Sequence, residues 1–278
     1  MAVNLQTATV CASANGLKVT VEEGKTLQAN AFIQAEFFQD YHIKEEVLTF
    51  KINLWVLVEC LSIFGSRSSP GMSAALKLMY NGHGSPLSLL IRLEEGGAVT
   101  DCKIVTRDAC ESLDFNFSSD RELEISGVHA VLVILQCNRV VNKLIMRSEC
   151  LREVFSELDQ SSAFLSFHIT TSPANLRLST SGNYGTDIPG DSEMIETFKC
   201  SSATSHSYRM SLLHTTFKFS YMRTQGLHPV QALAAAQKVS LRVDERGFMC
   251  LQFMIKAEGN EIAFVEFFVS IFGGNLWL

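Results

Sequence analysis

Alternation of apolar and polar residues with a period of two runs through this chain and limits its fold more than any other feature. The pattern is clearest in the segments 17–22, 48–54, 87–93 and 239–255. Side chains two residues apart lie on the same face of a β-strand. In the last segment the polar residues 244–247 interrupt the alternation, which is typical of a hairpin turn. We therefore expect antiparallel sheets built from hairpins rather than parallel β-α-β units.

Helical periodicity is confined to three short segments, 53–64, 148–160 and 229–237. The first carries leucines and valines at helical spacing and is followed by Gly65, a residue that often ends helices. In the second, Ser148 precedes the periodic residues and is the expected N-cap. The third is rich in alanine and begins with Pro229, which the first turn of a helix accepts. The predicted fold class is α+β, with mostly antiparallel sheet and a few helices.

Composition excludes several classes of protein. Apolar residues make up 47% of the 278 residues and charged residues 19%, which is not the composition of a disordered chain. The net charge of −6 argues against a dedicated high-affinity binder of nucleic acid, but it is compatible with a protein that holds DNA by shape. The longest strongly apolar run, 128–135, is far shorter than the roughly 20 residues that span a bilayer, so no membrane association is expected.

Eight cysteines occur, but no two of them form a C-x-x-C pair. Because that spacing is typical of zinc sites, a zinc site has no support from the sequence. The N-terminal residues lack the pattern of a secretory signal. We expect the cysteines to be reduced and mostly buried, as in a cytosolic or nuclear protein.

A polar stretch with several serines, beginning at 107, separates two parts of similar size. We expect a first domain over 1–108, a connector over 109–141 and a second domain over 142–278. Each part contains at least one predicted helix and a run of hairpin strands. This similarity suggests an internal duplication.

Three alternating acids, Asp120, Glu122 and Glu124, form the pattern closest to a catalytic one. On a strand they would share a face, where they could hold Mg²⁺ for phosphodiester cleavage. Nucleases of that kind need further acids and a residue that positions water, and the sequence identifies neither. It favours a solvated polar face, and we expect no catalytic residue, no metal ion and no cofactor.

Two groups of residues are candidates for binding. The basic residues around the second predicted helix could meet a phosphate backbone: Lys143, Arg147 and Arg152. Apolar residues punctuate the connector and could either form a groove for partner peptides or anchor the connector on the core: Leu113, Phe115 and Phe117. Together these observations favour a binding or structural role over catalysis.

Several long blocks of sequence carry more specific information than any short motif. They read NGLKVTV at 15–21, LQANAFIQA at 27–35, ECLSIFG at 59–65, LREVFSEL at 151–158 and RLSTSGN at 177–183. In content and order these blocks resemble the family of Rad-one subunits of the heterotrimeric DNA-damage checkpoint clamp. With further matches the resemblance runs, with gaps, from about residue 9 to 269.

The resemblance implies a two-domain sliding-clamp fold similar to proliferating cell nuclear antigen, with outer sheets and inner helices. It implies a nuclear protein that closes a ring around DNA together with Rad-nine-type and Hus-one-type subunits. A dedicated clamp loader would place the ring at damage sites, where it would support checkpoint kinase activation and stimulate repair enzymes. An exonuclease activity is also associated with the family, and a metal-dependent 3′–5′ exonuclease on the same fold is the alternative function.

The resemblance also implies positions for particular segments. Helices 53–64 and 148–160 would face the central hole, and 113–117 would belong to the connector. Two edges would pair with neighbouring subunits, one at 99–105 and one around 184–188. Their candidate residues are Val99, Asp101, Lys103, Val105, Tyr184 and Asp187.

The sequence departs from the family pattern in four places. Segments 120–139 and 217–230 look inserted, the second of them within the second inner helix of domain two. The opening strand and first inner helix of domain one look missing. The last residues, 270–278, are apolar where the family has an acidic tail.

Overall fold

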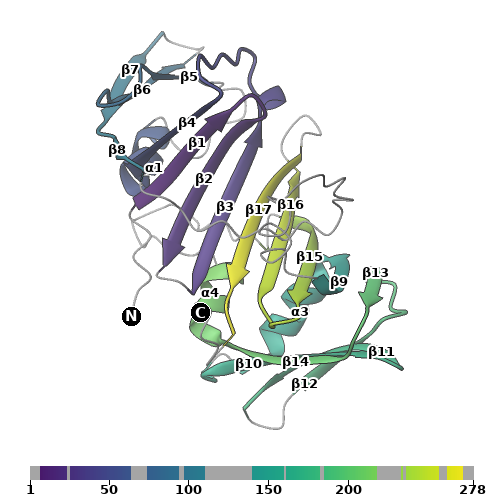
Figure 1. The fold of residues 1–278 in the computed structure, drawn as a ribbon. Helices are drawn as coiled ribbons and strands as arrows, with labels where there is room; N and C mark the ends of the chain where they lie inside the picture. The colour runs from purple at the N-terminus through teal and green to yellow at the C-terminus, as the bar shows by residue number, and fades with distance from the viewer. Residues whose placement is uncertain are drawn as a thin grey trace, which may run out of the picture. The chain divides into compact units, whose positions relative to one another are not determined.

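The chain folds into two compact units. The computed structural model describes residues 7–23, 26–63, 74–93, 97–109, 140–159, 161–181, 185–217, 233, 236–256 and 262–271. Among these, unit 1 holds 7–23 and 30–109, and unit 2 holds 26–29 and the residues from 140 onward. Figure 1 shows the elements of both units.

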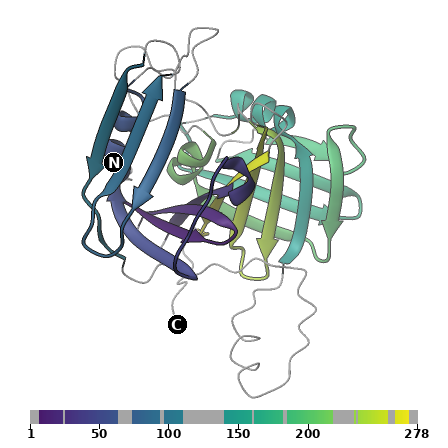
Figure 2. The ribbon, with the colours of Figure 1, turned by 90° about the horizontal axis from the view of Figure 1, so that it is seen from above.

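Unit 1 contains two layers of strands and one α-helix. In the first layer the strand order is β3-β2-β1-β4-β8, and the second layer is the three-stranded sheet β5-β6-β7. The first three residues of β3, Leu27 to Ala29, are counted with unit 2. Figure 2 shows the strands of this second sheet, in blue, side by side. The elements are β1 Thr7–Ser13, β2 Gly16–Glu23, β3 Leu27–Gln34, the 3-10 turn η1 Ala35–Phe37, β4 Val47–Asn53, α1 Leu54–Leu61, β5 Ala74–Tyr80, β6 Leu87–Leu93, β7 Val99–Ile104 and β8 Arg107–Asp108.

The core of unit 1 lies between these two layers. Val10 of β1 pairs with Phe50 of β4 in antiparallel register, and both side chains are buried. The ring of Tyr80, on β5, stacks on Phe50 with 4.2 Å between the ring centroids. The alternation in the sequence therefore gives β1, β4 and β6 one buried face each, as expected for a sheet covered on one side.

Unit 2 contains a four-stranded sheet of order β12-β11-β10-β14 and a five-stranded arrangement of order β13-β9-β15-β16-β17. Their antiparallel pairing confirms the α+β expectation. The elements are β9 Val140–Arg147, α3 Ser148–Glu157, β10 Phe164–Thr171, β11 Ala174–Thr180, β12 Gly185–Pro189, β13 Ile195–Cys200, β14 Thr204–Arg209, α4 Met210–Phe217, β15 Ala236–Asp244, β16 Met249–Lys256 and β17 Ile262–Val269.

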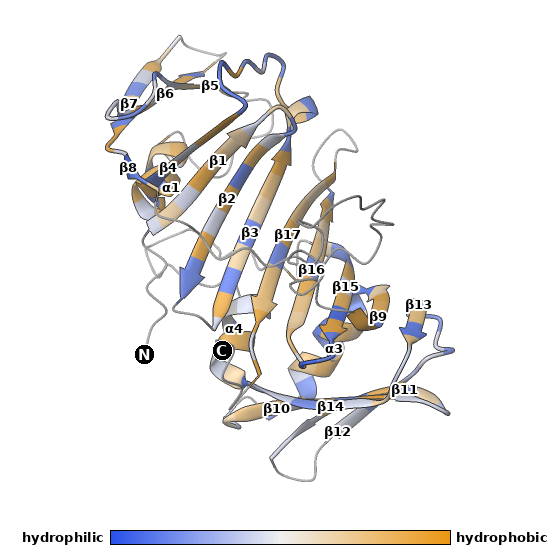
Figure 3. Ribbon diagram, in the orientation of Figure 1, coloured by the Kyte–Doolittle hydropathy of each residue, from blue (hydrophilic) through white to orange (hydrophobic). Residues whose placement is uncertain are grey.

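Large side chains from both sheets fill the core of unit 2. The buried residues include Leu144 and Met146 of β9 and Leu165 and Phe167 of β10. The ring of Tyr208 meets Phe167 edge-on at 5.4 Å between centroids. Figure 3 shows how strongly apolar residues dominate β16 and β17. Burial of this area is the main stabilising contribution to the unit.

The expected hairpin over 239–255 is confirmed, since β15 pairs with β16 in antiparallel register. The expected helix at 53–64 is also present as α1, although it ends at Leu61. Asn53 is the last residue of β4 and caps this helix, because its Oδ1 accepts hydrogen bonds from the backbone N–H groups of Trp55 and Val56.

Ser148 is not an N-cap, so that prediction is wrong. Arg147 occupies the cap position of α3 with an extended backbone and no side-chain cap. The hydroxyl of Ser148 is buried and donates to the backbone carbonyl of Ala236. A buried hydroxyl needs a partner, and here the start of β15 supplies a better one than the helix terminus does.

Three expected segment boundaries are also wrong. The helix at 229–237 does not extend to its end, because Ala236 and Gln237 belong to β15 and Ala236 pairs with Ile255. Strand pairing here outweighs the helix propensity of alanine. The polar stretch from 107 begins as the strand β8, which pairs with β4. Val140 and Val141, assigned to the connector, already form the start of β9.

The two units repeat one order of elements. In unit 1, β1-β2-β3-β4-α1-β5-β6-β7 follow one another, and in unit 2 the series is β10-β11-β12-β14-α4-β15-β16-β17, with β13 between β12 and β14. The spatial orders β3-β2-β1-β4 and β12-β11-β10-β14 also match. In addition, unit 2 has β9 and α3, and β9 lies between β13 and β15. The duplication suggested by the sequence is thus visible in the topology.

The six described cysteines are all free thiols. Cys150 and Cys250 are buried, and the other four are partly buried. Cys110 and Cys137 lie outside the described residues. Among the described helices, none is long and apolar enough to cross a membrane.

Gly16 should be essential to the β1–β2 turn. Its φ is +132°, and a Cβ at this position would overlap the backbone of Ile33 and Ala35. We expect Gly16→Ala to lower the free energy of unfolding by about 3 kcal/mol or more, because strain and overlap add. Gly84 has φ +76° with open space around it. Gly84→Ala should therefore cost only about 1 kcal/mol in urea unfolding, and equal losses in the two variants would contradict this account.

Candidate functional site

Strand β7 forms one outer edge of the sheet in unit 1. It pairs only with β6 among the described strands. Val99, Asp101 and Lys103 alternate along it on the exposed face, whereas Ile104 is buried. Val105 lies just beyond the end of the strand and is 77% exposed. An outer strand with exposed apolar residues is a surface on which another strand can pair.

Strand β12 is an outer edge in unit 2, next to β11. Its Asp187 accepts hydrogen bonds from Asn175 Nδ2 at 2.7 Å and from Arg177 Nη1 at 3.0 Å. The carboxylate is therefore paired with a cation within its own sheet. Any partner strand would meet the main chain of β12 and a carboxylate that already has two donors. Tyr184, the other candidate here, lies outside the described residues.

The basic candidates lie on two elements. Lys143 and Arg147 lie on the same face of β9, opposite to the buried Leu144 and Met146. Arg152 is on α3, 3.8 Å from the carboxylate of Glu149. The structure thus brings two of the three cations onto one strand face and leaves the third on the helix that follows.

One cation next to this group escaped the sequence analysis. Lys199 on β13 pairs directly with Lys143 in the strand register, and Arg242 on β15 does so from the other side. Arg242 is held by Glu266 at 3.3 Å, but Lys199 is exposed. Only long-range strand pairing puts these residues in one row, so no local pattern could have indicated it.

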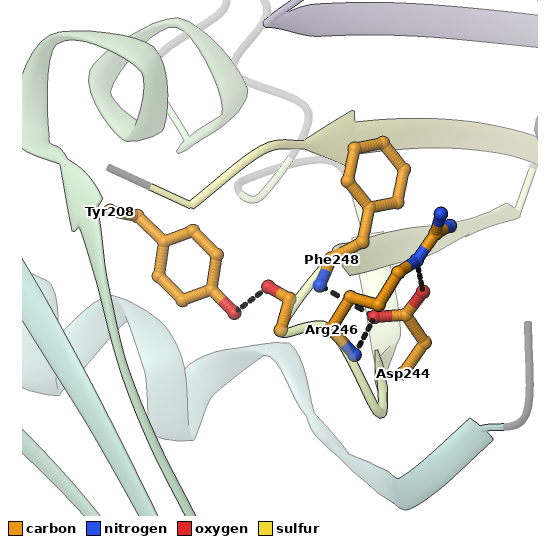
Figure 4. Close-up of polar contacts among 5 residues, drawn as sticks. Tyr208, Asp244, Arg246 and Phe248 are labelled. Atoms are coloured by element: carbon orange, nitrogen blue, oxygen red, sulfur yellow. Dashed lines mark hydrogen bonds and ion pairs between the residues drawn. The ribbon is translucent and has the colours of Figure 1, made fainter. Parts of the chain in front are cut away.

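The tip of the β15–β16 hairpin holds a cluster of polar contacts (Figure 4). Asp244 is fully buried, and its Oδ1 accepts hydrogen bonds from the backbone N–H groups of Phe248 at 2.7 Å and Arg246 at 2.9 Å. The guanidinium of Arg246 lies 3.3 Å from its other oxygen. A buried carboxylate with this many donors stabilises the turn, and nothing at the tip resembles a catalytic site.

Unit 2's two sheets meet at this tip. The hydroxyl of Tyr208, on β14, donates to the carbonyl of Gly247 at 2.7 Å. Burial raises the pKa of Tyr208, so its hydroxyl keeps the proton that it donates. Gly247 has φ +80°, and a Cβ there would collide with the ring of His206. The sequence showed a turn here but not its contact with β14.

The thiol of Cys60, on α1, lies next to Cys102 of β7, and its surroundings disfavour the reactive thiolate form. Burial, together with a hydrogen bond to Cys102, raises the pKa of Cys60 to about 11. The Cys60 thiol therefore stays protonated near neutral pH, which makes it a weak nucleophile and a poor metal ligand. In the part of the chain that the structure describes, no three His, Cys, Asp or Glu side chains group together as metal ligands.

The connector candidates Leu113, Phe115 and Phe117 lie outside the described residues. The same holds for the acids Asp120, Glu122 and Glu124 and for the segment 120–139. The candidate surface that the structure does describe consists of the outer strands β7 and β12 and the basic residues of β9, β13 and α3.

The sequence matches the family model described as Repair protein Rad1/Rec1/Rad17 over residues 1–255. It is 45% identical over 264 residues to the cell cycle checkpoint protein RAD1 of Mus musculus and to that of Homo sapiens. Each match covers 94% of this chain and 82% of the relative. A more distant relative is the DNA repair exonuclease REC1 of Mycosarcoma maydis, 26% identical over 210 residues, or 68% of this chain and 41% of that protein.

Two solved structures share the fold. The PCNA of Thermococcus kodakaraensis aligns with a TM-score of 0.63 and 14% identity over 96% of this chain and 91% of its own. A chain of the PCNA2–PCNA3 complex of Sulfolobus tokodaii aligns with a TM-score of 0.64 and 10% identity, over 96% and 90%. These likenesses confirm the sliding-clamp fold expected from the sequence.

The stability of unit 2 should fall in mild acid because of His206. Burial lowers the pKa of this imidazole, and the nearby Asp244 only partly opposes that effect. The unfolded chain, with a histidine pKa near about 6.5, then binds more protons than the native state as the pH drops below that value. The free energy of unfolding should decline from pH 7 toward pH 5.

Urea unfolding at a series of pH values measures this decline. The variant His206→Gln should flatten the curve over that window, because the residue no longer titrates. His42, which is exposed, provides the control, and His42→Gln should leave the decline in place. An unchanged slope in His206→Gln would show that other groups cause the decline.

Proposed function

This chain belongs to the Rad1/Rec1/Rad17 family of repair proteins, and we propose on this basis that it is a non-enzymatic subunit of a heterotrimeric ring clamp. The ring encircles DNA at damage sites in the nucleus. Its other two subunits are of the Rad-nine and Hus-one types, and a clamp loader opens and closes it. Once loaded, the ring supports checkpoint kinase activation and DNA repair.

The observation that carries the proposal is the combination of sequence identity and fold. Identity of 45% with RAD1 checkpoint proteins extends over 94% of the chain. The same chain has the fold of PCNA clamps. The similarity to checkpoint proteins supports the proposed roles in checkpoint signalling and repair. The sliding-clamp fold supports the proposed ring.

The outer strands supply a physical route to ring closure. Strands β7 and β12 each end a sheet, and each can pair with a strand of a neighbouring subunit. On β7 the exposed Val99 and the adjacent Val105 add apolar contact area. On β12 Asp187 is already paired with Arg177, so main-chain hydrogen bonds are the main contribution.

The acidic composition suits a clamp that holds DNA by enclosing it. A closed ring stays on DNA because of its topology, so it needs few phosphate contacts and tolerates the net charge of −6. We propose that Arg152, on the inner helix α3, contributes to the few contacts that it does make. Lys143, Arg147 and the neighbouring Lys199 belong to the sheet, and Lys143 and Arg147 lie on the face of β9 opposite to its buried residues, so they would add positive charge on the outer side of the ring.

Assembly tests the proposal directly. Co-expression with Rad-nine-type and Hus-one-type subunits, followed by size-exclusion chromatography with light scattering, should yield a one-to-one-to-one complex. The double variant V99D/V105D should lower the yield of that complex about tenfold, because it buries carboxylates in the β7 contact.

Val47 is 54% exposed, as is Val99, and lies on β4 rather than on β7. Val47→Asp is therefore the matched control and should leave assembly unchanged. A chain that never enters a complex with its two partners would contradict the proposed function. A complex insensitive to V99D/V105D would contradict the role of β7.

An exonuclease remains the second candidate, because the distant relative REC1 carries that name. If this chain were such an enzyme, the acids Asp120 and Glu122 would be its metal ligands. We expect the purified clamp to show no Mg²⁺-dependent degradation of a 3′-labelled DNA strand above background. Degradation that disappears in D120A/E122A, with assembly intact, would overturn the non-enzymatic assignment.

A further inference from the structure

We propose that the outer edge of β5 and the core face next to it form a binding site for a strand followed directly by an amphipathic helix. The occupant has the same chemistry as β9 and α3 of this chain. The argument rests on the two units themselves and does not depend on the proposed clamp function.

The repeated topology identifies the site. Strand β5 of unit 1 corresponds to β15 of unit 2, since each is the first strand after the helix that follows the matching strands β4 and β14, and each begins a three-strand series. In unit 2, β15 has β16 on one side and β9 on the other. In unit 1, β5 pairs with β6, and no described strand lies along its second edge.

The two strands β15 and β5 also differ in how deeply their side chains are buried. Val239, on the core face of β15, is fully buried, whereas Leu76 of β5 is 47% exposed. Yet Ile91, the cross-strand partner of Leu76 on β6, is 5% exposed. Leu76 therefore belongs to the core face of its sheet but is left uncovered on the side of the open edge.

The adjacent helices differ in the same way. In unit 2, α4 buries Met210, Leu212 and Leu213. Its counterpart α1 is more apolar, but none of its eight residues is buried, and Val58 and Leu61 are more than 40% exposed. An apolar helix with no buried residue indicates that part of the inner layer of unit 1 is open.

The covering element in unit 2 defines the occupant. Strand β9 ends at Arg147 and α3 begins at Ser148, so strand and helix follow each other without a loop. The strand pairs with β15 from Lys238 to Asp244, and α3 contacts both strands. Its Leu151 and Val154 are buried. A matching occupant pairs antiparallel with β5 through main-chain hydrogen bonds and lays an apolar helix face over Leu76.

A peptide with the sequence of residues 140–160 of this chain is the probe. Labelled with fluorescein and titrated with the full-length chain, it should give a saturable rise in fluorescence anisotropy. Leu76→Glu should weaken binding at least about tenfold, because it places a charge on the covered face. Hydrogen exchange should show added protection in β5 when the peptide is bound.

Matched controls separate this site from other modes of binding. Ile262 is an exposed apolar residue of β17 in unit 2, and Ile262→Glu should leave the affinity unchanged. In the peptide, Leu144→Pro should abolish binding by disrupting the strand, and Leu151→Asp should weaken it by disrupting the helix face. Because Leu76 is half-exposed, L76E should keep the circular dichroism spectrum of the parent chain, which verifies its folding.

Three outcomes would overturn the proposal. The first is the absence of saturable binding to the parent chain. The second is equal binding to the parent chain and to L76E, which would mean that the peptide exchanges with β9 and α3 in unit 2. The third is a dimer of the parent chain that L76E dissociates and that the peptide cannot displace, because a second copy would then cover β5.

Discussion

Every antiparallel strand has two hydrogen-bonding edges, and this protein depends on how each edge is satisfied. Interior strands such as β1 and β15 are paired on both sides and supply the buried residues of their units. Strands β5, β7 and β12 each have a described neighbour on one side alone. Unpaired edges attract other strands, so the functions proposed here all concern the same kind of group: main-chain N–H and C=O groups at the end of a sheet.

The two units show that one order of elements can be completed to different degrees. Unit 2 adds β9 and α3 to the repeated series, and its strand β15 is covered on both edges and on its core face. In unit 1 the corresponding strand has the apolar residues of an interior strand but is largely exposed. Helix α1 is also apolar, although none of its residues is buried. The sequence of unit 1 is that of a domain with more partners than its described residues provide.

The strands and the fold class could be predicted from the sequence because period-two alternation is a local signal. Ranges such as 48–54 and 239–255 needed no knowledge of their neighbours. Errors arose where a distant group decided the outcome. Ser148 looks like a helix cap until the carbonyl of Ala236 is known to lie beside it. Ala236 itself follows its strand partner rather than its helix propensity. Lys199 joins the basic residues only through pairing between β13 and β9. Asp187 forms an ion pair with Arg177 on the neighbouring strand.

The turn around Asp244 has a consequence for how unit 2 opens. The Asp244 carboxylate holds the N–H groups of Arg246 and Phe248, and the Tyr208 hydroxyl fastens the same turn to β14 in the other sheet. Neither sheet can separate from the other without releasing this turn. The β15–β16 hairpin and β14 should therefore open together as one cooperative unit, with the amide of Phe248 among the slowest in the protein to exchange with solvent.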